Sequence, residues 1–371
     1  MSGDRYAADV VRELRAAGGV WRVEGFGGPR LAEAGVRLRA DLSELAVMGI
    51  VEVVRRLGFF VRLLRATRRS WEEDPPDAVL FVDYPGLNLR LARHARRLGL
   101  RTLYYITPTV WAWNERRVGA LRANVDELLV ILPFEEAFFA ARGLRARFVG
   151  HPLGREARRP RHRAAFLREL GLDPAADVLG LLPGSRTQEL RSLAAPFLAA
   201  AERLRAVFPR PLQLAFAVAT PELAAELRRR VGDLVPIAVG GSADLIAAST
   251  AVLTKSGTAT VEAALLGTPM VVAYRMNPLT LWLARRLVKV EWFAMVNILR
   301  GKAVVPELLQ REASPAEIAR QALPLLDRTN PARMRMVAEF DALREDLLRR
   351  DAPAEVARAV RDAVSSARRA R

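Results

Sequence analysis

A short apolar run meets a glycine turn and then a helix in Val178-Leu-Gly-Leu-Leu182-Pro-Gly-Ser-Arg186, and this stretch indicates the fold. Five nonpolar residues in a row are typical of a strand that is covered on both faces, as in a parallel sheet. The helical stretch Leu190–Phe208 follows at once. Strand, tight turn and helix in this order form the repeating unit of an α/β domain, so we expect a parallel sheet.

The same alternation extends in both directions from this stretch. The strands expected before it are Ala78–Asp83, Thr102–Ile106, Glu127–Leu132 and Arg147–Gly150. The strands expected after it are Gln213–Val218, Val235–Val239, Ala251–Thr254 and Pro269–Tyr274. The pattern predicts two Rossmann-like domains that face a cleft, with ligands at the carboxyl ends of the strands.

Prolines and arginines concentrate between residues 151 and 177, where we place the domain boundary. The first domain is expected over residues 1–155 and the second over 175–310. The tail, 311–371, is expected to be helical and either to return to the first domain or to cross to a partner chain in a homodimer.

The N-terminus departs from the Rossmann pattern, because the chain runs straight into a helix at Arg5–Ala17 where a strand is expected first. We therefore expect the first strand of this sheet to be missing. Our hypothesis is a misassigned start codon, with a natural protein longer by roughly 15–20 residues, about one short strand and its turn. An intact mass equal to that of the 371-residue chain would contradict it.

Composition limits the classes of partner and site. The chain has 371 residues, no cysteine and three histidines, which excludes disulfides and thiolate metal sites and argues against a histidine-rich one. Its net charge is +17, which suits anionic partners such as nucleic acid, anionic lipid or phosphorylated substrates. Compositional drift toward arginine is the alternative. The longest uncharged apolar stretch, Ala263–Tyr274, is shorter than the ~20 residues that span a bilayer, so we expect a cytoplasmic protein.

Two turns have the composition of phosphate-binding loops. In the first, Gly184 allows close approach of a phosphate, Ser185 and the helix amides can donate to it, and Arg186 can clamp it. The second turn is Lys255-Ser-Gly-Thr258, and Glu262 lies one helical turn later, where its carboxylate can bind ribose hydroxyls. The alternatives are an ordinary turn at the first position and a capping box at the second.

The first half of the chain carries a carboxylate and two tryptophans after expected strands. Asp83 follows one strand, where a general base would reach a substrate hydroxyl, and the alternative is an Asx turn or a helix cap. Trp111 and Trp113 lie in a loop after the next strand, where they either contact a sugar or acyl chains or pack in the core.

Two segments combine a wide apolar face with arginines. In 47–64 the apolar face includes Val54, Phe59 and Phe60, and Arg55 and Arg62 begin a basic stripe. Such a helix either lies in a bilayer interface or is buried with a solvated arginine face. The segment 281–293 has a similar composition.

Taken together and in order, these stretches resemble the lipid-A-disaccharide synthase family over nearly the whole chain. The early motifs are Gly27-Gly-Pro-Arg30, Glu44–Glu52, Pro108-Thr-Val-Trp-Ala-Trp113, Leu132-Pro-Phe-Glu135 and Phe148-Val-Gly-His-Pro152. The later motifs are Leu182-Pro-Gly-Ser-Arg186, Ser256-Gly-Thr-Ala-Thr260, Pro269–Arg275, Trp282–Lys289 and Val305–Gln310. Each motif alone is weak evidence for the family, whereas the order and spacing of all of them are specific to it.

The resemblance implies a GT-B fold and a metal-free, cofactor-free glycosyltransferase. Such an enzyme transfers 2,3-diacylglucosamine from UDP to the 6-hydroxyl of 2,3-diacylglucosamine 1-phosphate (lipid X), with inversion at the anomeric carbon. Its place would be the inner face of the inner membrane, against an anionic lipid surface. Nucleic acid is not an expected partner, because no recognition motif accompanies the charge.

The resemblance also assigns roles by position. Asp83 would be the general base, and Arg186 and Asn297 would offset charge at the departing diphosphate. Residues expected to bind UDP are Gly184, Ser185, Arg186, Ser256, Gly257, Thr258 and Glu262. Residues expected to contact the acceptor or its acyl chains are Asn88, Trp111, Val54, Phe59 and Phe60.

The chain departs from the family pattern in three places. Only Ser2-Gly3-Asp4 remains of the first turn, Gly86 replaces an aspartate, and Val296 replaces a proline. The first departure keeps open a truncated, inactive form that still binds UDP or membrane. Another UDP-sugar enzyme of the same fold, such as a UDP-N-acetylglucosamine 2-epimerase, is the other alternative.

Overall fold

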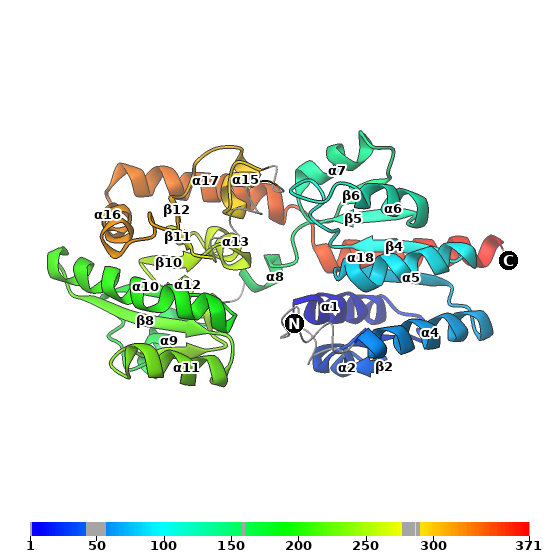
Figure 1. The fold of residues 1–371 in the computed structure, drawn as a ribbon, viewed down its shortest axis with the longest axis horizontal. Helices are drawn as coiled ribbons and strands as arrows, with labels where there is room; N and C mark the ends of the chain where they lie inside the picture. The colour runs from blue at the N-terminus through cyan, green and yellow to red at the C-terminus, as the bar shows by residue number, and fades with distance from the viewer. Residues whose placement is uncertain (1, 42–56, 158–159, 277–285, 287–289, 371) are drawn as a thin grey trace. The chain divides into compact units, whose positions relative to one another are not determined.

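A computed structural model describes residues 2–41, 57–157, 160–276, 286 and 290–370 of the chain, which form two compact units (Figure 1). Unit 1 comprises residues 1–152 and 347–371, and unit 2 comprises residues 153–346. All the strand pairs recorded in the described parts are parallel. The prediction of an α/β protein with parallel sheets in two domains is confirmed.

Unit 2 is built on a six-stranded sheet. Its strands are β7 (Asp177–Leu182), β8 (Leu212–Val218), β9 (Ile237–Val239), β10 (Ala251–Lys255), β11 (Met270–Tyr274) and β12 (Glu307–Leu309). Their order in space is β12-β11-β10-β7-β8-β9. Numbered from β7, this is the 3-2-1-4-5-6 order of a dinucleotide-binding Rossmann fold, read from the other edge. The strand order reverses between β7 and β10, which is where such folds bind ligands.

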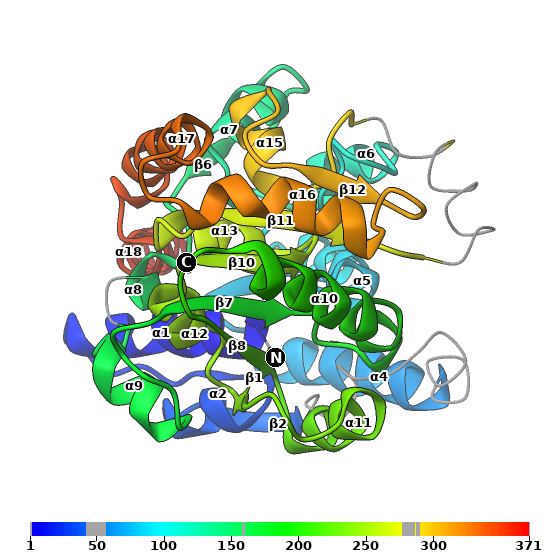
Figure 2. The ribbon, with the colours of Figure 1, turned by 90° about the vertical axis from the view of Figure 1, so that its left-hand side faces the viewer.

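Helices cover both faces of this sheet (Figure 2). One layer consists of α10 (Thr187–Val207), α11 (Pro221–Val231) and α16 (Pro315–Leu326), which contact one another through α10. The other consists of α9 (Arg163–Glu169), α12 (Ser242–Ala248), α13 (Thr258–Leu265) and α15 (Met295–Arg300). With both faces covered, β7 is buried along its whole length, as its apolar run predicts. The short α8 (Gly154–Ala157) also belongs to unit 2.

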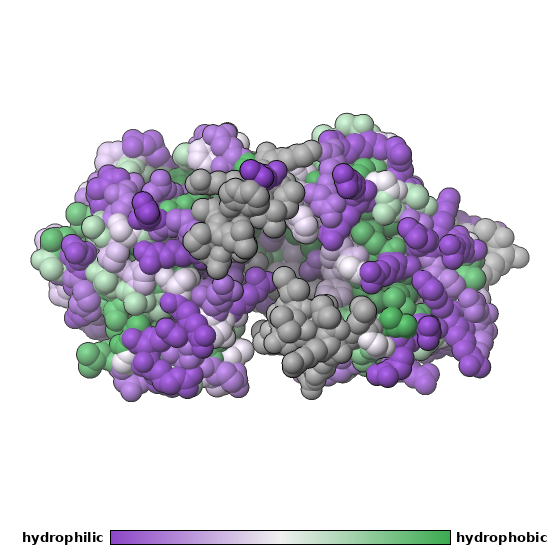
Figure 3. Space-filling view, viewed as in Figure 1, coloured by the Kyte–Doolittle hydropathy of each residue, from purple (hydrophilic) through white to green (hydrophobic). Residues whose placement is uncertain are grey.

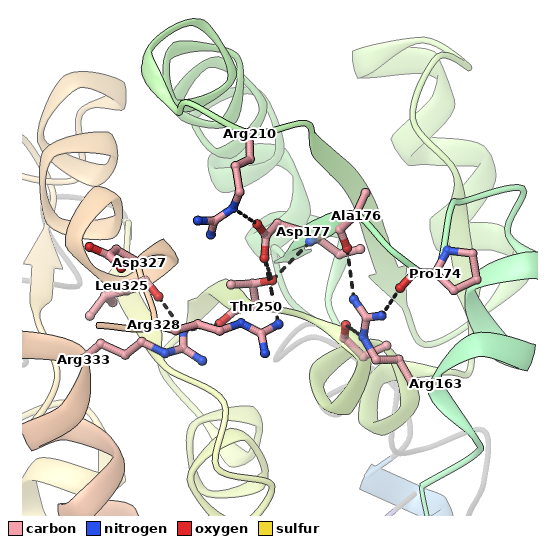
Figure 4. A network of polar contacts seen from close by, with 12 residues as sticks. Arg163, Pro174, Ala176, Asp177, Arg210, Thr250, Leu325, Asp327, Arg328 and Arg333 are labelled. Carbon is pink, nitrogen blue, oxygen red and sulfur yellow. Dashed lines mark hydrogen bonds and ion pairs between the residues drawn. The ribbon is translucent and has the colours of Figure 1, made fainter. Parts of the chain in front are cut away.

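The amino ends of β7 and β10 are joined by a polar network (Figure 4). The Asp177 carboxylate accepts from Arg210 Nε at 2.8 Å and from Thr250 Oγ1 at 2.9 Å. Arg333 of α17 (Pro331–Leu348) donates to the Thr250 carbonyl at 2.6 Å. Burial would raise the pKa of Asp177, but the hydrogen bonds from Arg210 and Thr250 outweigh it and lower the pKa. The network lies at the opposite end of the strands from the turns with phosphate-loop composition, so its role is to hold the sheet together.

Unit 1 has its strands in two separate sheets. The larger has the order β3-β4-β5-β6. Its strands are β3 (Ala78–Val82), β4 (Arg101–Tyr105), β5 (Glu127–Val130) and β6 (Ala146–Phe148). The smaller pairs β1 (Glu24–Gly27) with β2 (Arg37–Asp41). The helices that accompany these strands are α2 (Pro29–Glu33), α4 (Leu57–Glu73), α5 (Pro85–Arg97), α6 (Arg117–Asn124) and α7 (Pro133–Ala140).

Helix α1 (Ser2–Ala16) contributes to two hydrophobic cores of unit 1. No described strand precedes this helix. Its Tyr6, Val10 and Leu14 join a core with β4, β5 and α18 (Ala352–Ala370). Its Ala8 and Val11 join a second core with α2 and the start of β2. Asp4 caps α2, since its carboxylate accepts from the amides of Gly28 at 2.6 Å and Arg30 at 3.1 Å. Thus Ser2-Gly3-Asp4 and Gly27-Gly-Pro-Arg30, two separate motifs in the sequence, are joined in the structure.

The expected C-terminal region, 311–371, is divided between the units. Helix α16 and all but the end of α17 belong to unit 2, and α18 belongs to unit 1. The return is fixed at Phe148-Val-Gly-His-Pro152, where the His151 amide donates to the Leu347 carbonyl at 3.1 Å. Gly150 has φ +92°, and a Cβ there would lie 2.3 Å from the Arg350 carbonyl oxygen. Only glycine fits this close approach.

The surface is mainly hydrophilic on the face shown in Figure 3, where hydrophobic residues gather in small groups. Helix α4 is amphipathic, with Phe60, Leu63 and Thr67 buried and Arg62 and Arg65 exposed. None of the described helices is long and apolar enough to cross a membrane.

Candidate active site

The two turns with phosphate-loop composition are neighbours in unit 2. Leu182 at the end of β7 pairs with Thr254 near the end of β10, so both turns leave the sheet at its carboxyl edge. They flank the point where the strand order reverses. Both turns therefore lie at carboxyl ends of strands, where the sequence pattern predicts ligands, and the strand pairing brings them together.

Glu189 links the two turns. It is 8% exposed, and its Oε2 accepts from the amides of Ser185 at 3.0 Å and Arg186 at 3.2 Å. Its Oε1 accepts from Lys255 Nζ at 3.1 Å. We expected the amides after Gly184 to face a phosphate, and that expectation needs correction, because two of them donate to Glu189. Two described cations lie beside Glu189 at this edge, Lys255 and Arg186.

Gly184 serves the same internal contact. Its φ is +131°, and a Cβ at this position would lie 2.5 Å from Glu189 Oε2. The glycine thus admits the carboxylate of Glu189. The Arg186 side chain is 80% exposed, with Glu189 Oε1 3.7 Å from its NH1 atom, so it can move toward a ligand. Tyr274 ends β11 beside them, and burial and Glu189 raise its pKa while Arg186 lowers it.

Four residues in and after the second turn are predicted to bind UDP: Ser256, Gly257, Thr258 and Glu262. Ser256 Oγ donates to the Phe293 carbonyl at 2.6 Å, and Thr258 is exposed at the first position of α13. Gly257 lies close to the Lys255 side chain, 2.8 Å from Nζ to the position of an added Cβ. Glu262 is half-buried in α13. Ser256, Gly257 and Thr258 therefore follow the carboxyl end of β10 directly, and Glu262 lies one turn further along α13.

Asn297 is completely buried. The expectation that it contacts the departing diphosphate directly therefore needs correction. Its Nδ2 donates to Glu307 Oε1 at 2.8 Å and to the Val305 carbonyl at 3.0 Å. Its Oδ1 accepts from the amides of Val304 at 2.8 Å and Val305 at 2.9 Å. Both donors and both acceptor positions of the amide are used. Because Glu307 also accepts from the amides of Phe293 and Ala294, Asn297 positions the segment that receives the Ser256 hydroxyl.

In unit 1, Asp83 directly follows β3 on a strained turn. Asp83 and Tyr84 have φ of +47° and +45°, a conformation that non-glycine residues adopt rarely. The turn is held by the Asp83 carbonyl, which accepts from Tyr104 Oη at 2.7 Å and from Asn88 Nδ2 at 2.6 Å. The side chain of Asp83 is exposed, and no hydrogen bond or ion pair joins it to another described residue. Strain of this kind is often retained at functional sites.

Asn88, which is expected to contact the acceptor, is part of this support. Its amide nitrogen also donates to the Val82 carbonyl at 3.1 Å, so both N–H groups are occupied. Asn88 therefore holds the backbone that carries Asp83, and a contact of its Oδ1 atom with the acceptor stays a prediction.

A pocket of about 270 Å³ lies beside Asp83. It is lined by Asp83, Pro85, Ile106, Thr107, Pro108, Thr109, Val110, Trp113 and Arg117. Ile106 and the nearby Asn114 also have positive φ, at +58° and +56°. Four of the five positive-φ non-glycine residues in the described parts thus border or adjoin this pocket, with Gln310 in unit 2 the exception.

The two tryptophans of this loop have different roles. Trp113 is 44% exposed, lines the pocket, and lies under the Arg117 guanidinium, with 5.1 Å from Cζ to the ring centroid. Trp111 is half-buried, packs edge-on against Phe134, and donates from Nε1 to Glu135 Oε1 at 3.0 Å. Trp111 is not among the lining residues of this pocket, so the structure places Trp113 there.

Glu135 anchors the loop from beneath. It is 2% exposed, and it also accepts from Thr107 Oγ1 at 3.3 Å and from the Leu132 amide at 3.1 Å. Burial raises its pKa to about 7, against the lowering effect of the hydrogen bonds from Trp111, Leu132 and Thr107. Its protonation therefore changes near neutral pH, directly below the pocket.

The predicted acyl-chain contacts give a mixed result. Phe60 is buried and stacks on Tyr84, with ring centroids 6.3 Å apart, so it supports the Asp83 turn and is not exposed to lipid. Phe59 is half-buried beside it. Val54 and most of the segment 281–293 lie outside the described residues.

Comparison with known proteins decides the family. A sequence model described as "Lipid-A-disaccharide synthetase" matches residues 1–359. The chain belongs to the lipid-A-disaccharide synthase family. Relatives in this family include the lipid-A-disaccharide synthase of Nitrosococcus oceani, 42% identical, with 93% of this chain and 90% of the relative covered. That of Anaeromyxobacter dehalogenans is 42% identical, with 97% and 94% covered.

Solved structures agree on the fold. A glycosyltransferase of kitacinnamycin superposes with a TM-score of 0.65 at 19% identity, covering 97% of this chain and 95% of that one. The calicheamicin glycosyltransferase CalG4 superposes with a TM-score of 0.60 at 18% identity, covering 97% and 94%. The fold is thus of the GT-B type, and the family is one of glycosyltransferases, as the motif order predicted.

Sequence reasoning gave no role to several residues of the candidate site, which are Glu189, Lys255, Tyr274, Arg117 and, as a loop anchor, Glu135. A signal existed for the two glutamates. Each is the third residue of a helix, the position from which a carboxylate reaches back to cap the first amides. No local signal marks Arg117, because its contact with Trp113 depends on how the loop folds.

Proposed function

We propose that the chain transfers 2,3-diacylglucosamine from UDP-2,3-diacylglucosamine to the 6-hydroxyl of lipid X, releasing UDP with inversion at the anomeric carbon. The observation that carries the proposal is the Asp83 carboxylate. It is exposed beside a pocket, is held on a strained turn, and has no described hydrogen-bond partner, as a general base for a hydroxyl requires. The lipid-A-disaccharide synthase family, to which the chain belongs, supplies the class of reaction.

The donor half of the proposal rests on unit 2. Arg186 and Lys255 lie at the strand-order reversal, where they offset the charge of a diphosphate, and Ser256, Thr258 and Glu262 stand around the second turn. Tyr274 borders the same edge. Asn297 acts here as a positioning residue through Glu307. The step needs one proton removed from the acceptor hydroxyl and one UDP released, and the proposal assigns it no metal or cofactor.

The test is turnover of UDP-2,3-diacylglucosamine with lipid X, followed as UDP and disaccharide. We expect activity in the wild type and a kcat lower by about 10²- to 10⁴-fold in Asp83→Asn, which keeps the shape but cannot take the proton. Asp77→Asn is the control, since Asp77 precedes the same strand at its far end. UDP release without an acylated acceptor would favour an epimerase-like reaction, and UDP binding without turnover would favour an inactive form.

We also propose that the enzyme binds the inner face of the inner membrane peripherally. The exposed Arg62 and Arg65 of α4 present a cationic surface to anionic lipid, worth about 1 kcal/mol for each arginine near the surface. We expect co-sedimentation with phosphatidylglycerol vesicles at low salt and weaker binding by Arg62→Gln/Arg65→Gln. Equal binding to neutral phosphatidylcholine vesicles would contradict this. A homodimer through the C-terminal helices stays a prediction, to be tested by light scattering.

A further inference from the structure

Two of the residues that line the pocket beside Asp83 carry opposite charges. Asp83 contributes a carboxylate and Arg117 a guanidinium, and the remaining lining residues are uncharged. Burial raises the pKa of Tyr104, Asp83 raises it further, and Arg117 lowers it, so both charges act on the same hydroxyl group. A ligand in this pocket meets a proton acceptor and a cation together.

Arg117 is the one arginine that lines this pocket, and none of the described acidic residues forms an ion pair with it. Arg142 nearby, by contrast, makes a two-pronged contact with Glu115 at 2.8 and 3.0 Å. The recorded partner of the Arg117 side chain is the Trp113 ring. A guanidinium stacked on a ring keeps its edge N–H groups available, and these match the oxygens of a phosphate bidentately.

The geometry of the loop fixes this pair in place. Arg117 is the first residue of α6, and its amide donates to the Asn114 carbonyl at 3.1 Å. Trp113 and Asn114 continue the loop that Glu135 anchors through Trp111. The stacking surface and the cation are therefore held before any ligand arrives, which reduces the entropy lost on binding.

We propose that Arg117, stacked on Trp113, binds the phosphate of the acceptor sugar, so that this pocket selects a sugar phosphomonoester over the same sugar without phosphate. This inference rests on the proposed function, since it names what the acceptor side recognises. Arg117 and Asp83 line the same pocket, so the positive charge of Arg117 also offsets the repulsion between the phosphate and the Asp83 carboxylate.

The experiment compares lipid X with 2,3-diacylglucosamine that lacks the phosphate, at saturating UDP-2,3-diacylglucosamine. We expect Arg117→Met to lower the ratio of kcat/KM values, phosphorylated over unphosphorylated, by about 10- to 100-fold, the worth of a charge-assisted bidentate contact. The loss should appear mainly as a higher KM for lipid X. Arg117→Lys should give a ratio between those of the wild type and Arg117→Met, because lysine keeps the positive charge but lacks the paired N–H donors of a guanidinium.

Arg116→Met is the matched control. Arg116 is the neighbouring residue, is exposed, and does not line the pocket, so this variant should keep the wild-type ratio. An unchanged ratio in Arg117→Met, with turnover intact, would overturn the inference and leave the proposed function standing. If the wild type turns over neither acceptor, the proposed function fails. The inference is then decided by calorimetric titration with glucosamine 1-phosphate, which must bind wild type more tightly than Arg117→Met.

Discussion

Glu189 in unit 2 and Glu135 in unit 1 occupy the same local position in different surroundings. Each is the third residue of a helix that follows a strand, and each accepts from backbone amides at the start of that helix. Glu189 then meets a cation, Lys255, from the neighbouring turn. Among the residues that the structure describes, Glu135 meets neutral donors from the neighbouring loop, Trp111 and Thr107.

The difference shows how one capping arrangement serves two purposes. Beside Lys255, the carboxylate holds a cation at the edge where we place the diphosphate. Beneath the pocket of unit 1, the carboxylate lacks a compensating charge, and burial raises its pKa to about 7. The first glutamate holds Lys255 in place, and the second fixes a loop whose support depends on pH.

The largest expected effect comes from removing Glu189. In Glu189→Ala the amides of Ser185 and Arg186 lose their acceptor and Lys255 loses its ion pair, so we expect a loss of about 2–4 kcal/mol in the free energy of unfolding. KM for the UDP-sugar should rise as well, because the turn is no longer held. Urea unfolding and donor titration measure the two effects.

The matched control lies on the same helix. Glu202 forms an exposed ion pair with Arg205, so Glu202→Ala should cost less than about 1 kcal/mol and leave the KM unchanged. If both variants lose the same stability, the contrast between a buried capping carboxylate and a surface pair is wrong for this helix.

A smaller effect is expected from Glu135→Gln, and it depends on pH. The unfolded carboxyl ionises near its ordinary value of 4.5, whereas the folded one keeps its proton up to about 7. The unfolded state therefore binds fewer protons in this window, and the stability of the wild type should fall as pH rises from 4.5 to 7. Relative to Glu135→Gln, which cannot titrate, we expect a fall of about 1–3 kcal/mol, measured by urea unfolding across the window.

Trp111→Phe sharpens this test. The variant keeps a ring against Phe134 but removes the indole donor that lowers the pKa of Glu135, so the upper end of the pH window should move upward. A downward movement, or a wild-type stability that rises between pH 4.5 and 7 relative to Glu135→Gln, would contradict the assignment of Glu135 as the titrating group.

Much of the fold was predictable because it depends on local periodicity. The apolar runs ending at Leu182, Thr254 and Tyr274 each became a strand of unit 2 within about one residue of the expected bounds. The placement of both turns with phosphate-loop composition at one sheet edge followed from the order of strands and helices. Asp83 was predictable as an exposed carboxylate at a strand end, because that place follows from the sequence pattern.

The roles of Asn88, Asn297 and the Ser185 amide were not predictable in the same way. Each was expected to face a ligand, and each is used by the protein's own backbone or by Glu189. A polar side chain or amide in a turn satisfies whichever partner the folded chain brings near, and the sequence pattern does not distinguish a ligand from a carbonyl.

The sequence by itself determined the parallel α/β architecture, the family and the chain positions of the candidate base and turns, since all of these follow from periodicity and motif order. The tertiary structure decided what each charged side chain meets: Lys255 meets Glu189, Arg117 meets the Trp113 ring, and Glu135 meets no cation among the described residues. The physical reason is that strands and caps depend on neighbours within a few residues. Pairing, burial and the pKa depend instead on side chains tens of residues away, such as Lys255, which lies 66 positions beyond Glu189.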